Sequence, residues 1–334
     1  MKRSKLWAGA VLVTLVLFTF SVQAQGVVSL EDQTGEEVEI ETPVERIVCL
    51  NPALNEILAI LGAEDRIVGI NEGTEFPPVF EGILEVGGSS RNPQVEKIIE
   101  LKPDVIIADT MLDEEVRKQF ESFGIPVVVE RASELNRLPK VIENLGKIVD
   151  NEDRAEELNS FIGEYNKLIE DRLSSLEKED RTDVYWEWRG AYRSGNEDSN
   201  IHPRLELTEA NNIAAHLEAP YPQVSAEFVW ERDPEVIIRM ASRSDSKEDM
   251  AQTREEIVNR QGLKEVEAVK NERVYLISWD VMNGPRSVVG SLYFANWFYP
   301  EKFVDIEPEE VYQEMLAEFY NYEGETAPVV FPGE

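Results

Sequence analysis

The residues best suited to contact a ligand lie in two segments, each directly after an apolar run that predicts a buried strand. Aromatic rings with an arginine nearby suit a flat or anionic ligand, because rings pack its faces and a guanidinium pairs its charge. We therefore expect a small-molecule site here, although the rings could also be core residues and the arginines solvated. The expected ligand contacts are Trp186, Trp188, Arg189 and Tyr192 in the first segment, and Asn283 and Arg286 in the second.

Residues that could perform catalysis are scarce. Cys49 lies in the apolar run 47–50 and predicts a buried core thiol. His216 falls in a predicted helix over 206–217 as a surface residue, whereas His202 lies in a polar loop, where a ligand role stays open. No zinc-protease, dithiol, serine-hydrolase or phosphate-loop motif occurs. We therefore expect no enzyme activity, cofactor or metal site; the alternative from another class is a secreted α/β enzyme.

The first 24 residues have the layout of a cleaved secretory signal peptide. Lys2, Arg3 and Lys5 precede an apolar run over 6–20, and Ala24 ends a small-residue cleavage motif. The run is shorter than the about 20 residues that a membrane-spanning helix needs, although an uncleaved anchor is the alternative. No cysteine follows it, so we expect no lipid anchor. The sequence predicts a soluble protein outside the cytoplasmic membrane, either periplasmic or otherwise extracytoplasmic.

The charge balance excludes one class of partner. The chain has 66 Asp and Glu against 33 Lys and Arg, a formal net charge of −33. Such a chain would be repelled by a phosphate backbone, so we expect no nucleic-acid binding. The acids are spread along the chain, and a distributed acidic surface keeps a protein soluble where salt screens charge strongly. We hypothesise adaptation to a salt-rich habitat; an ordinary acidic secreted protein is the alternative.

Short apolar runs alternate with helical stretches, which is typical of an α/β protein whose parallel sheet is covered on both faces. One helix is expected to begin with Asn51 as its N-cap and proline at its first position. The predicted strands are 47–50, 66–70, 104–108, 125–130, 183–188, 235–240 and 273–278, and the early helices are 53–61, 95–101 and 114–123.

A longer helix is predicted over 152–176, where apolar residues recur at helical spacing with a single glycine and no proline. Twenty-five helical residues reach about 38 Å, enough to join two lobes as a strut, with an ordinary surface helix as the alternative. The expected organisation is a signal peptide over 1–24, an N-terminal lobe over 25–150, a connecting helix over 151–180 and a C-terminal lobe over 181–334.

An internal repeat supports two similar lobes. Residues 94–108 and 225–239 match at a fixed offset of 131, with six of fifteen positions identical. Glu96 pairs with Glu227 in this alignment, and both segments predict a helix, a proline stop and a buried strand. Chance convergence on a common helix-to-strand motif is the alternative.

These motifs together resemble the class III (helical-backbone) substrate-binding proteins of ABC importers, the family of iron-siderophore, haem and cobalamin binders. The resemblance covers about Glu45 to the C-terminal helix. It rests on 46–52 with Asn55-Glu56 just after, on 95–105, on the long helix and on 222–228. It implies two Rossmann-like α/β lobes with parallel-rich sheets, joined by one long rigid interdomain helix. The two ligand segments do not match a pattern that identifies one ligand.

The resemblance also implies partners. In the cobalamin-binding relatives one glutamate on each lobe docks onto arginines of the dimeric permease, which works with an ATPase; Glu96 and Glu227 are the matching positions. The preferred ligand is a ferric siderophore or similar anionic metal chelate, with Arg189 and Arg286 pairing its negative groups. Cobalamin, haem and an oxyanion such as molybdate remain alternatives within the family, as does a sensor-type module without a transporter. We expect a monomer.

Overall fold

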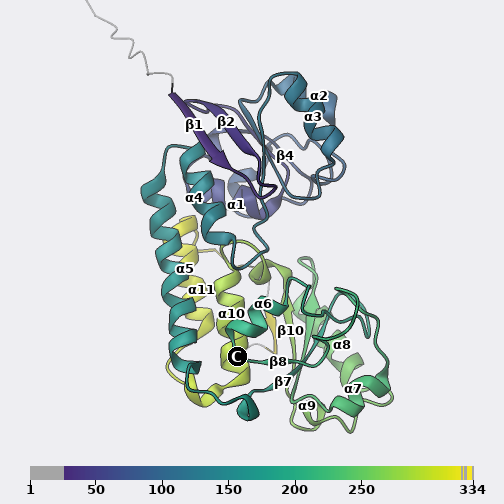
Figure 1. The fold of residues 1–334 in the computed structure, drawn as a ribbon. Helices are drawn as coiled ribbons and strands as arrows, with labels where there is room; N and C mark the ends of the chain where they lie inside the picture. The colour runs from purple at the N-terminus through teal and green to yellow at the C-terminus, as the bar shows by residue number, and fades with distance from the viewer. Residues whose placement is uncertain (1–25, 325, 327–328, 333–334) are drawn as a thin grey trace, which may run out of the picture.

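The computed structural model describes residues 26–324, 326 and 329–332, so the predicted signal peptide lies outside the described residues. Two α/β lobes are joined on one side by helices that stand between them (Figure 1). Each lobe carries its own parallel-rich sheet, which confirms the predicted fold. No helix within the described ranges is both long and apolar enough to cross a membrane.

The N-terminal lobe is built on a four-stranded parallel sheet in the order β4-β3-β5-β6. An antiparallel hairpin of β1 (Gly26–Glu31) and β2 (Glu37–Thr42) precedes it, which the sequence analysis did not predict. The strands of the sheet are β3 (Ile47–Cys49), β4 (Ile67–Ile70), β5 (Val105–Ala108) and β6 (Val127–Val129), and the helices are α1 (Pro52–Ile60), α2 (Val95–Leu101), α3 (Glu114–Ser122) and α4 (Leu138–Ile148).

The C-terminal lobe has a five-stranded sheet in the order β11-β10-β9-β7-β8, parallel except for the edge strand β11. Its strands are β7 (Asp183–Glu187), β8 (Asn211–Asn212), β9 (Val236–Ala241), β10 (Val274–Ser278) and β11 (Val330–Phe331). Its helices are α6 (His202–Leu207), α7 (Ala226–Arg232), α8 (Lys247–Val258), α9 (Glu267–Lys270), α10 (Ser287–Phe298) and α11 (Pro308–Tyr320).

The connecting strut is α5 (Glu152–Leu173), a helix of 22 residues whose N-cap is Asn151. It packs against α4 of the first lobe and against α10 and α6 of the second. The C-terminal helix α11 contacts α1 of the first lobe, so it provides a second connection between the lobes beside α5. At 1.5 Å per residue the helix is about 33 Å long, which suits the predicted role as a rigid connector.

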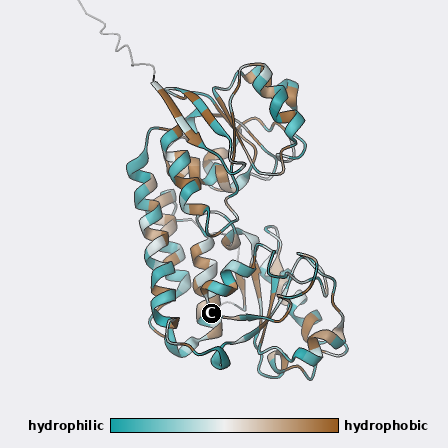
Figure 2. Cartoon of the chain, in the orientation of Figure 1, coloured by the Kyte–Doolittle hydropathy of each residue, from teal (hydrophilic) through white to brown (hydrophobic). Residues whose placement is uncertain are grey.

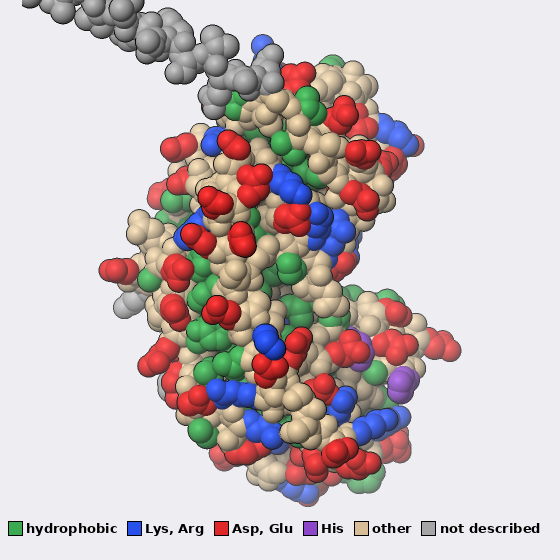
Figure 3. Space-filling model, turned by 60° about the vertical axis from the view of Figure 1, so that its left-hand side comes forward, with side chains coloured by type: hydrophobic (Ala, Val, Ile, Leu, Met, Phe, Trp, Pro, Cys, Tyr) green, Lys and Arg blue, Asp and Glu red, His purple; other side chains and the backbone are tan. Residues whose placement is uncertain are grey.

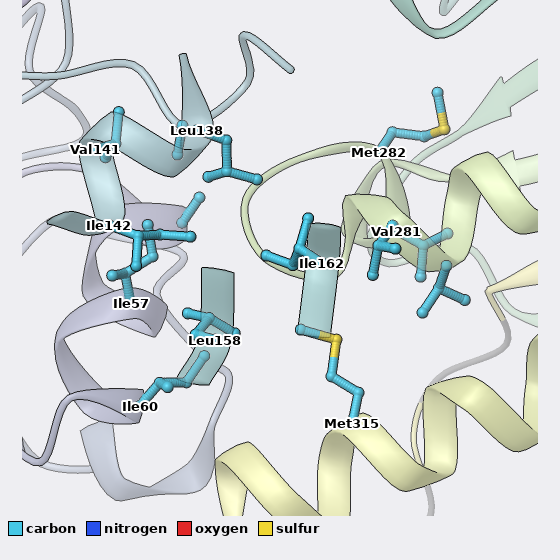
Figure 4. Packing of buried hydrophobic residues seen from close by; sticks show 14 of the residues in the cluster. Ile57, Ile60, Leu138, Val141, Ile142, Leu158, Ile162, Val281, Met282 and Met315 are labelled. Carbon is cyan, nitrogen blue, oxygen red and sulfur yellow. The ribbon is translucent and has the colours of Figure 1, made fainter. Parts of the chain in front are cut away.

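One apolar core runs through the helices from lobe to lobe, and Figure 4 shows a part of it. The apolar residues of the sheets lie inside each lobe, while the outer faces of the helices are hydrophilic (Figure 2). Because the lobes share this core, a change in their relative orientation has to repack it. The labelled members are Ile57 and Ile60 of α1, Leu138, Val141 and Ile142 of α4, Leu158 and Ile162 of α5, Val281 and Met282 just after β10, and Met315 of α11.

The predicted repeat is also a structural repeat. Helices α2 and α7 have seven residues each, and each ends in a left-handed residue, Lys102 with φ 47° and Asp233 with φ 42°. A proline and a carboxylate follow in both lobes. Asp104 accepts a hydrogen bond of 2.8 Å from the Arg46 amide, just before β3. Glu235 accepts one of 2.9 Å from the amide of Asp183, the first residue of β7.

The predicted helix over 206–217 is wrong. Helix α6 begins at His202 and ends at Leu207, and β8 begins at Asn211. The reason is a competing pairing: Asn211 and Asn212 add a short parallel strand beside β7, and the Asn211 side chain donates to Asp183 at 2.9 Å. His216 lies after this strand and its side chain is exposed, as expected for a surface residue.

Acidic side chains cover both lobes broadly, as Figure 3 shows for the displayed face of each.

Between the lobes, one carboxylate is buried away from solvent. Glu56 of α1 forms a bidentate ion pair with Arg286, with contacts of 2.7 and 2.9 Å, and both side chains are buried. The hydroxyl of Tyr320 also donates to Glu56 at 3.1 Å, and the Arg286 guanidinium lies 4.7 Å from the Phe76 ring centroid.

Breaking this pair should destabilise the protein strongly. Glu56→Gln leaves the Arg286 charge buried without its partner, which typically costs about 3–5 kcal/mol in the free energy of unfolding. The double variant Glu56→Gln/Arg286→Met removes both charges and should recover much of that loss. Urea unfolding monitored by circular dichroism measures both effects.

The matched control is Asp305→Asn, which breaks the exposed Arg172–Asp305 pair, whose carboxylate side chain is 62% exposed. Exposed pairs contribute about 1 kcal/mol or less. A loss for Glu56→Gln no larger than for this control would contradict a stabilising role of the buried pair.

Candidate ligand-binding cleft

A cavity of about 1110 Å³ lies between the lobes, and its walls are the carboxyl ends of strands from both sheets. Open α/β sheets bind ligands at this end of their strands. In the first lobe β3, β4, β5 and β6 lead into Asn51, Asn71, Asp109 and Arg131, and in the second β7, β9 and β10 lead into Trp188, Arg243 and Trp279. The space-filling view shows the hollow between the two lobes (Figure 3).

On the first lobe's side of the cleft, hydrogen bonds at the N-terminus of α1 hold the lining residues in place. Asn51 is its N-cap, as predicted, and its side-chain oxygen accepts from the amide of Ala53 at 2.9 Å. Its amide nitrogen points to Asp109, 3.4 Å away. Ser90 ties this region together, because its hydroxyl donates to the Leu50 carbonyl at 3.0 Å and accepts from the Asp109 amide at 2.8 Å.

The second lobe contributes an aromatic wall. Trp188 lies edge-on to Trp279, with ring centroids 5.4 Å apart, and beside Tyr221 at 5.1 Å. The guanidinium of Arg189 lies over the Trp188 ring at 5.4 Å. Trp188 and Arg189 were predicted as ligand contacts and do line the cavity. Tyr221 was missed because no strand or arginine adjoins it in the sequence.

The cations of the cleft are all arginines: Arg91, Arg131, Arg189 and Arg243. Arg131 pairs with Glu134 at 3.4 Å and also bonds Thr110, while Arg243 pairs with Asp280 at 3.0 Å. Within the described residues Arg91 and Arg189 form no ion pair. The cleft thus has four arginines against five carboxylates, whereas the whole chain has 33 basic residues against 66 acidic ones, so the cleft is less acidic than the chain as a whole. The five carboxylates are Glu72, Asp109, Glu134, Glu197 and Asp198.

Asn283, another predicted ligand contact, also lines the cleft and is 8% exposed. Its side-chain carbonyl oxygen has no hydrogen-bond partner in the described part of the chain. Buried polar atoms are nearly always paired, so an orphaned oxygen at a cavity wall offers an acceptor to a ligand donor.

Three of the predicted ligand contacts do not line the cleft, contrary to the prediction that they would touch a ligand there. Trp186 is fully buried within β7 and packs against Phe294 of α10, with ring centroids 6.2 Å apart. Tyr192 turns away, with its ring 5.2 Å from the Arg260 guanidinium. Arg286 is committed to the buried pair with Glu56. Each of these three side chains packs on other parts of the lobes and does not line the cavity.

The two predicted docking residues are exposed. Glu96 and Glu227 lie in the first turns of α2 and α7, on the side of each lobe away from α5 (Figure 1). His202, for which a ligand role was open, begins α6 and does not line the cleft. Over the described ranges no group of three or more His, Cys, Asp or Glu side chains is placed to hold a metal ion.

Asp109 is the buried carboxylate of the cleft wall, and burial raises its pKa, against the opposing effect of the nearby Arg131 charge. A raised folded-state pKa means that the folded protein is favoured below the ordinary value of 3.8 and loses that advantage as pH rises through the folded value. The stability of the wild type should therefore fall relative to Asp109→Asn when pH is raised from about 3 to 7.

The control for this prediction has the opposite sign. The hydrogen bond from Arg172 lowers the pKa of Asp305, so the wild type should gain stability relative to Asp305→Asn over the same pH range. Paired thermal melts at each pH measure both differences. A pH-independent difference for Asp109→Asn would contradict the burial argument.

Comparison with known proteins agrees with this geometry. A family model described as periplasmic binding protein matches residues 47–280. An uncharacterized ABC transporter substrate-binding lipoprotein of Bacillus subtilis is 28% identical over 83% of this chain and 87% of its own length. The molybdate-binding protein MolA of Haemophilus influenzae is 24% identical over 93% and 96% of the two chains. A vitamin B12-binding protein of Vibrio parahaemolyticus is 28% identical over 73% and 84%.

The fold comparison gives the same result. A TroA-like periplasmic binding protein from Veillonella parvula superposes with a TM-score of 0.77 at 22% identity, covering 91% of this chain and 99% of its own. MolA with bound molybdate superposes with a TM-score of 0.76 over 90% and 99%. The relatives are substrate-binding transport proteins, which points to binding rather than catalysis. The chain belongs to the periplasmic binding protein family, as a substrate-binding protein of the ABC transporter type.

Proposed function

We propose that this protein works outside the cytoplasmic membrane, captures an anionic metal chelate of the ferric-siderophore type between its lobes and delivers it to a permease dimer. The observation that carries the proposal is the joint presence of arginines and a cluster of aromatic rings in one cleft. Arg91 and Arg189 have no carboxylate partner among the described residues, so their charge is available to a ligand. Trp188, Trp279 and Tyr221 supply apolar faces for its rings.

The size of the cleft favours a large ligand. Small-molecule pockets in proteins span about 300–1,000 Å³, and this cleft of about 1110 Å³ lies just above that range. A tetrahedral oxyanion, the ligand named for the MolA relative, would leave most of that volume to solvent. A multidentate chelate can instead reach the arginines of both lobes at once.

A corrinoid is the second candidate, because relatives of this chain are named as vitamin B12-binding or cobalamin-binding proteins. Side-chain amides are common in the cleft and can exchange hydrogen bonds with an amide-rich ligand. The unpaired carbonyl oxygen of Asn283 is the most specific of these. The amides that line the cleft belong to Asn51, Asn71, Asn136, Asn200 and Asn283.

A ligand panel separates these candidates. We expect native mass spectrometry to show one ferric chelate bound to each monomer when ferric tris-catecholate or ferric citrate is offered. Cyanocobalamin, haem and molybdate form the competing arms, and the iron-free chelators control for the metal. Exclusive binding of the neutral corrinoid would replace the siderophore proposal with the second candidate.

Docking onto the permease is proposed for Glu96 and Glu227. They hold equivalent positions in the structural repeat, so two like lobes present like carboxylates to two like permease subunits. A carboxylate in the first turn also favours the helix itself, by about 0.3–1 kcal/mol, which would explain its position without docking. Transport distinguishes the two explanations, whereas stability does not.

The double variant Glu96→Ala/Glu227→Ala should keep its ligand affinity but lose most uptake through the cognate permease. Uptake of labelled ligand into proteoliposomes carrying the transporter measures this loss. The matched control is Glu100→Ala/Glu231→Ala, which removes two exposed carboxylates from the same helices, again at equivalent repeat positions. Equal uptake by the two double variants would show that the docking surface lies elsewhere.

A further inference from the structure

A chain of alternating charges runs from the cleft to the contact between the lobes. Arg243 Nε lies 3.0 Å from Asp280 Oδ1, and Arg286 Nη2 lies 3.6 Å from the same oxygen. Arg286 in turn holds Glu56 of the other lobe at 2.7 Å. Side-chain exposure falls steadily along this chain, from 31% to 17%, 4% and 2%. The outer end therefore faces the cleft, while the inner end is sealed between the lobes.

The contact with Asp280 leaves the outer edge of Arg243 free. The ion pair with Asp280 is closest at Nε, and within the described residues the two Nη atoms form no hydrogen bond. Arg243 lines the cleft, so a ligand in the cleft can approach its guanidinium. A guanidinium edge of this kind binds the paired oxygens of a carboxylate, hydroxamate or catecholate with two parallel hydrogen bonds.

Asp280 is itself held in place by the side chain of Ser278, the last residue of β10. Its amide donates to the Ser278 hydroxyl at 3.2 Å, and that hydroxyl lies 3.4 Å from Asp280 Oδ2. With Oδ2 engaged there, Oδ1 is the atom shared by Arg243 and Arg286. Because the guanidinium groups of Arg243 and Arg286 share Asp280 Oδ1, a change in the contact of one should alter the strength of the contact of the other.

We propose that Arg243 binds the anionic group of the ligand, and that Asp280 is a positioning residue that couples this contact to the Glu56–Arg286 pair between the lobes. This inference rests on the proposed anionic ligand. Coupling between sites is reciprocal, so ligand bound at Arg243 changes the strength of the lobe contact and the lobe contact changes ligand affinity. The route needs no backbone rearrangement, since every member is already in contact.

The ligand experiment uses calorimetry with ferric tris-catecholate as the probe. We expect Arg243→Gln to weaken binding about tenfold or more, as for loss of a bidentate charge pair. Asp280→Asn is the decisive variant, because deleting a negative charge beside an anionic ligand should tighten binding if only net charge matters. A positioning role predicts that binding weakens instead, and that Asp280→Glu restores part of it. The control Arg232→Gln makes the same charge change on α7, outside the cleft.

A ligand-free experiment tests the coupling by itself. Arg243→Gln and Glu56→Gln are combined in a double-mutant cycle on unfolding, in the wild type and in the Asp280→Asn background. The two side chains are not an ion pair with each other, so coupling between them has to pass through intermediates. We expect non-additive effects in the wild type and additive effects once Asp280 is neutralised.

The outcomes separate the inference from the proposed function. Tighter binding by Asp280→Asn, or additive effects in the wild-type cycle, would overturn the coupling. If no anionic chelate binds but cyanocobalamin does, the proposed ligand is wrong and so is the ligand-contact role of Arg243. The cycle then still decides whether Asp280 connects the cleft wall to the lobe contact.

Discussion

The buried pair between Glu56 and Arg286 is the interaction on which the geometry of the cleft depends. It joins the first helix of one lobe to the chain just before α10 of the other. The backbone beside it is equally close: the Gly284 amide donates to the Ala132 carbonyl at 3.1 Å. At Gly284 φ is +64°, and a Cβ would lie 3.0 Å from that of Ala53. Glycine is therefore favoured where the lobes touch, and the charge pair fixes which groups face each other there.

The structural repeat explains why both walls of the cleft are made in the same way. Each lobe repeats a helix, a left-handed residue, a proline and a strand, and each strand delivers its carboxyl end to the same space. The two walls differ in chemistry because the residues after the strands differ. The first wall is polar, with Asp109 and Arg131. The second is a cluster of aromatic rings, with Arg189 over the ring of Trp188. A shared fold thus positions two unlike surfaces around one cleft.

The main parallel strands, the strut and the repeat could be predicted because their signals are local: apolar runs, helical spacing and proline stops. The β1–β2 hairpin and the short strands β8 and β11 lack such a signal and were not predicted. The site could be predicted only in part. Trp186 and Trp188 both precede an arginine-bearing loop. Because β7 ends at Glu187, Trp188 lies just past the strand and lines the cleft, whereas Trp186 lies within the strand and packs against α10. The partner of Arg286 is 230 positions away in sequence, and no local pattern indicates such a contact. Long-range pairing of this kind appears only when both lobes are in place.

The acidity of the chain and the arginines of the cleft act over different distances. At a formal charge of −33 the protein repels an anionic chelate at long range, while contact with a guanidinium attracts it at short range. Salt shortens the range of repulsion, from a Debye length of about 10 Å at 0.1 M to about 3 Å at 1 M. Partly buried pairs are screened much less, so the contacts inside the cleft persist. In concentrated salt the acidic surface would therefore stop opposing capture of an anionic ligand, while the ion pair of Arg243 with Asp280, and with it the proposed ligand contact, would persist.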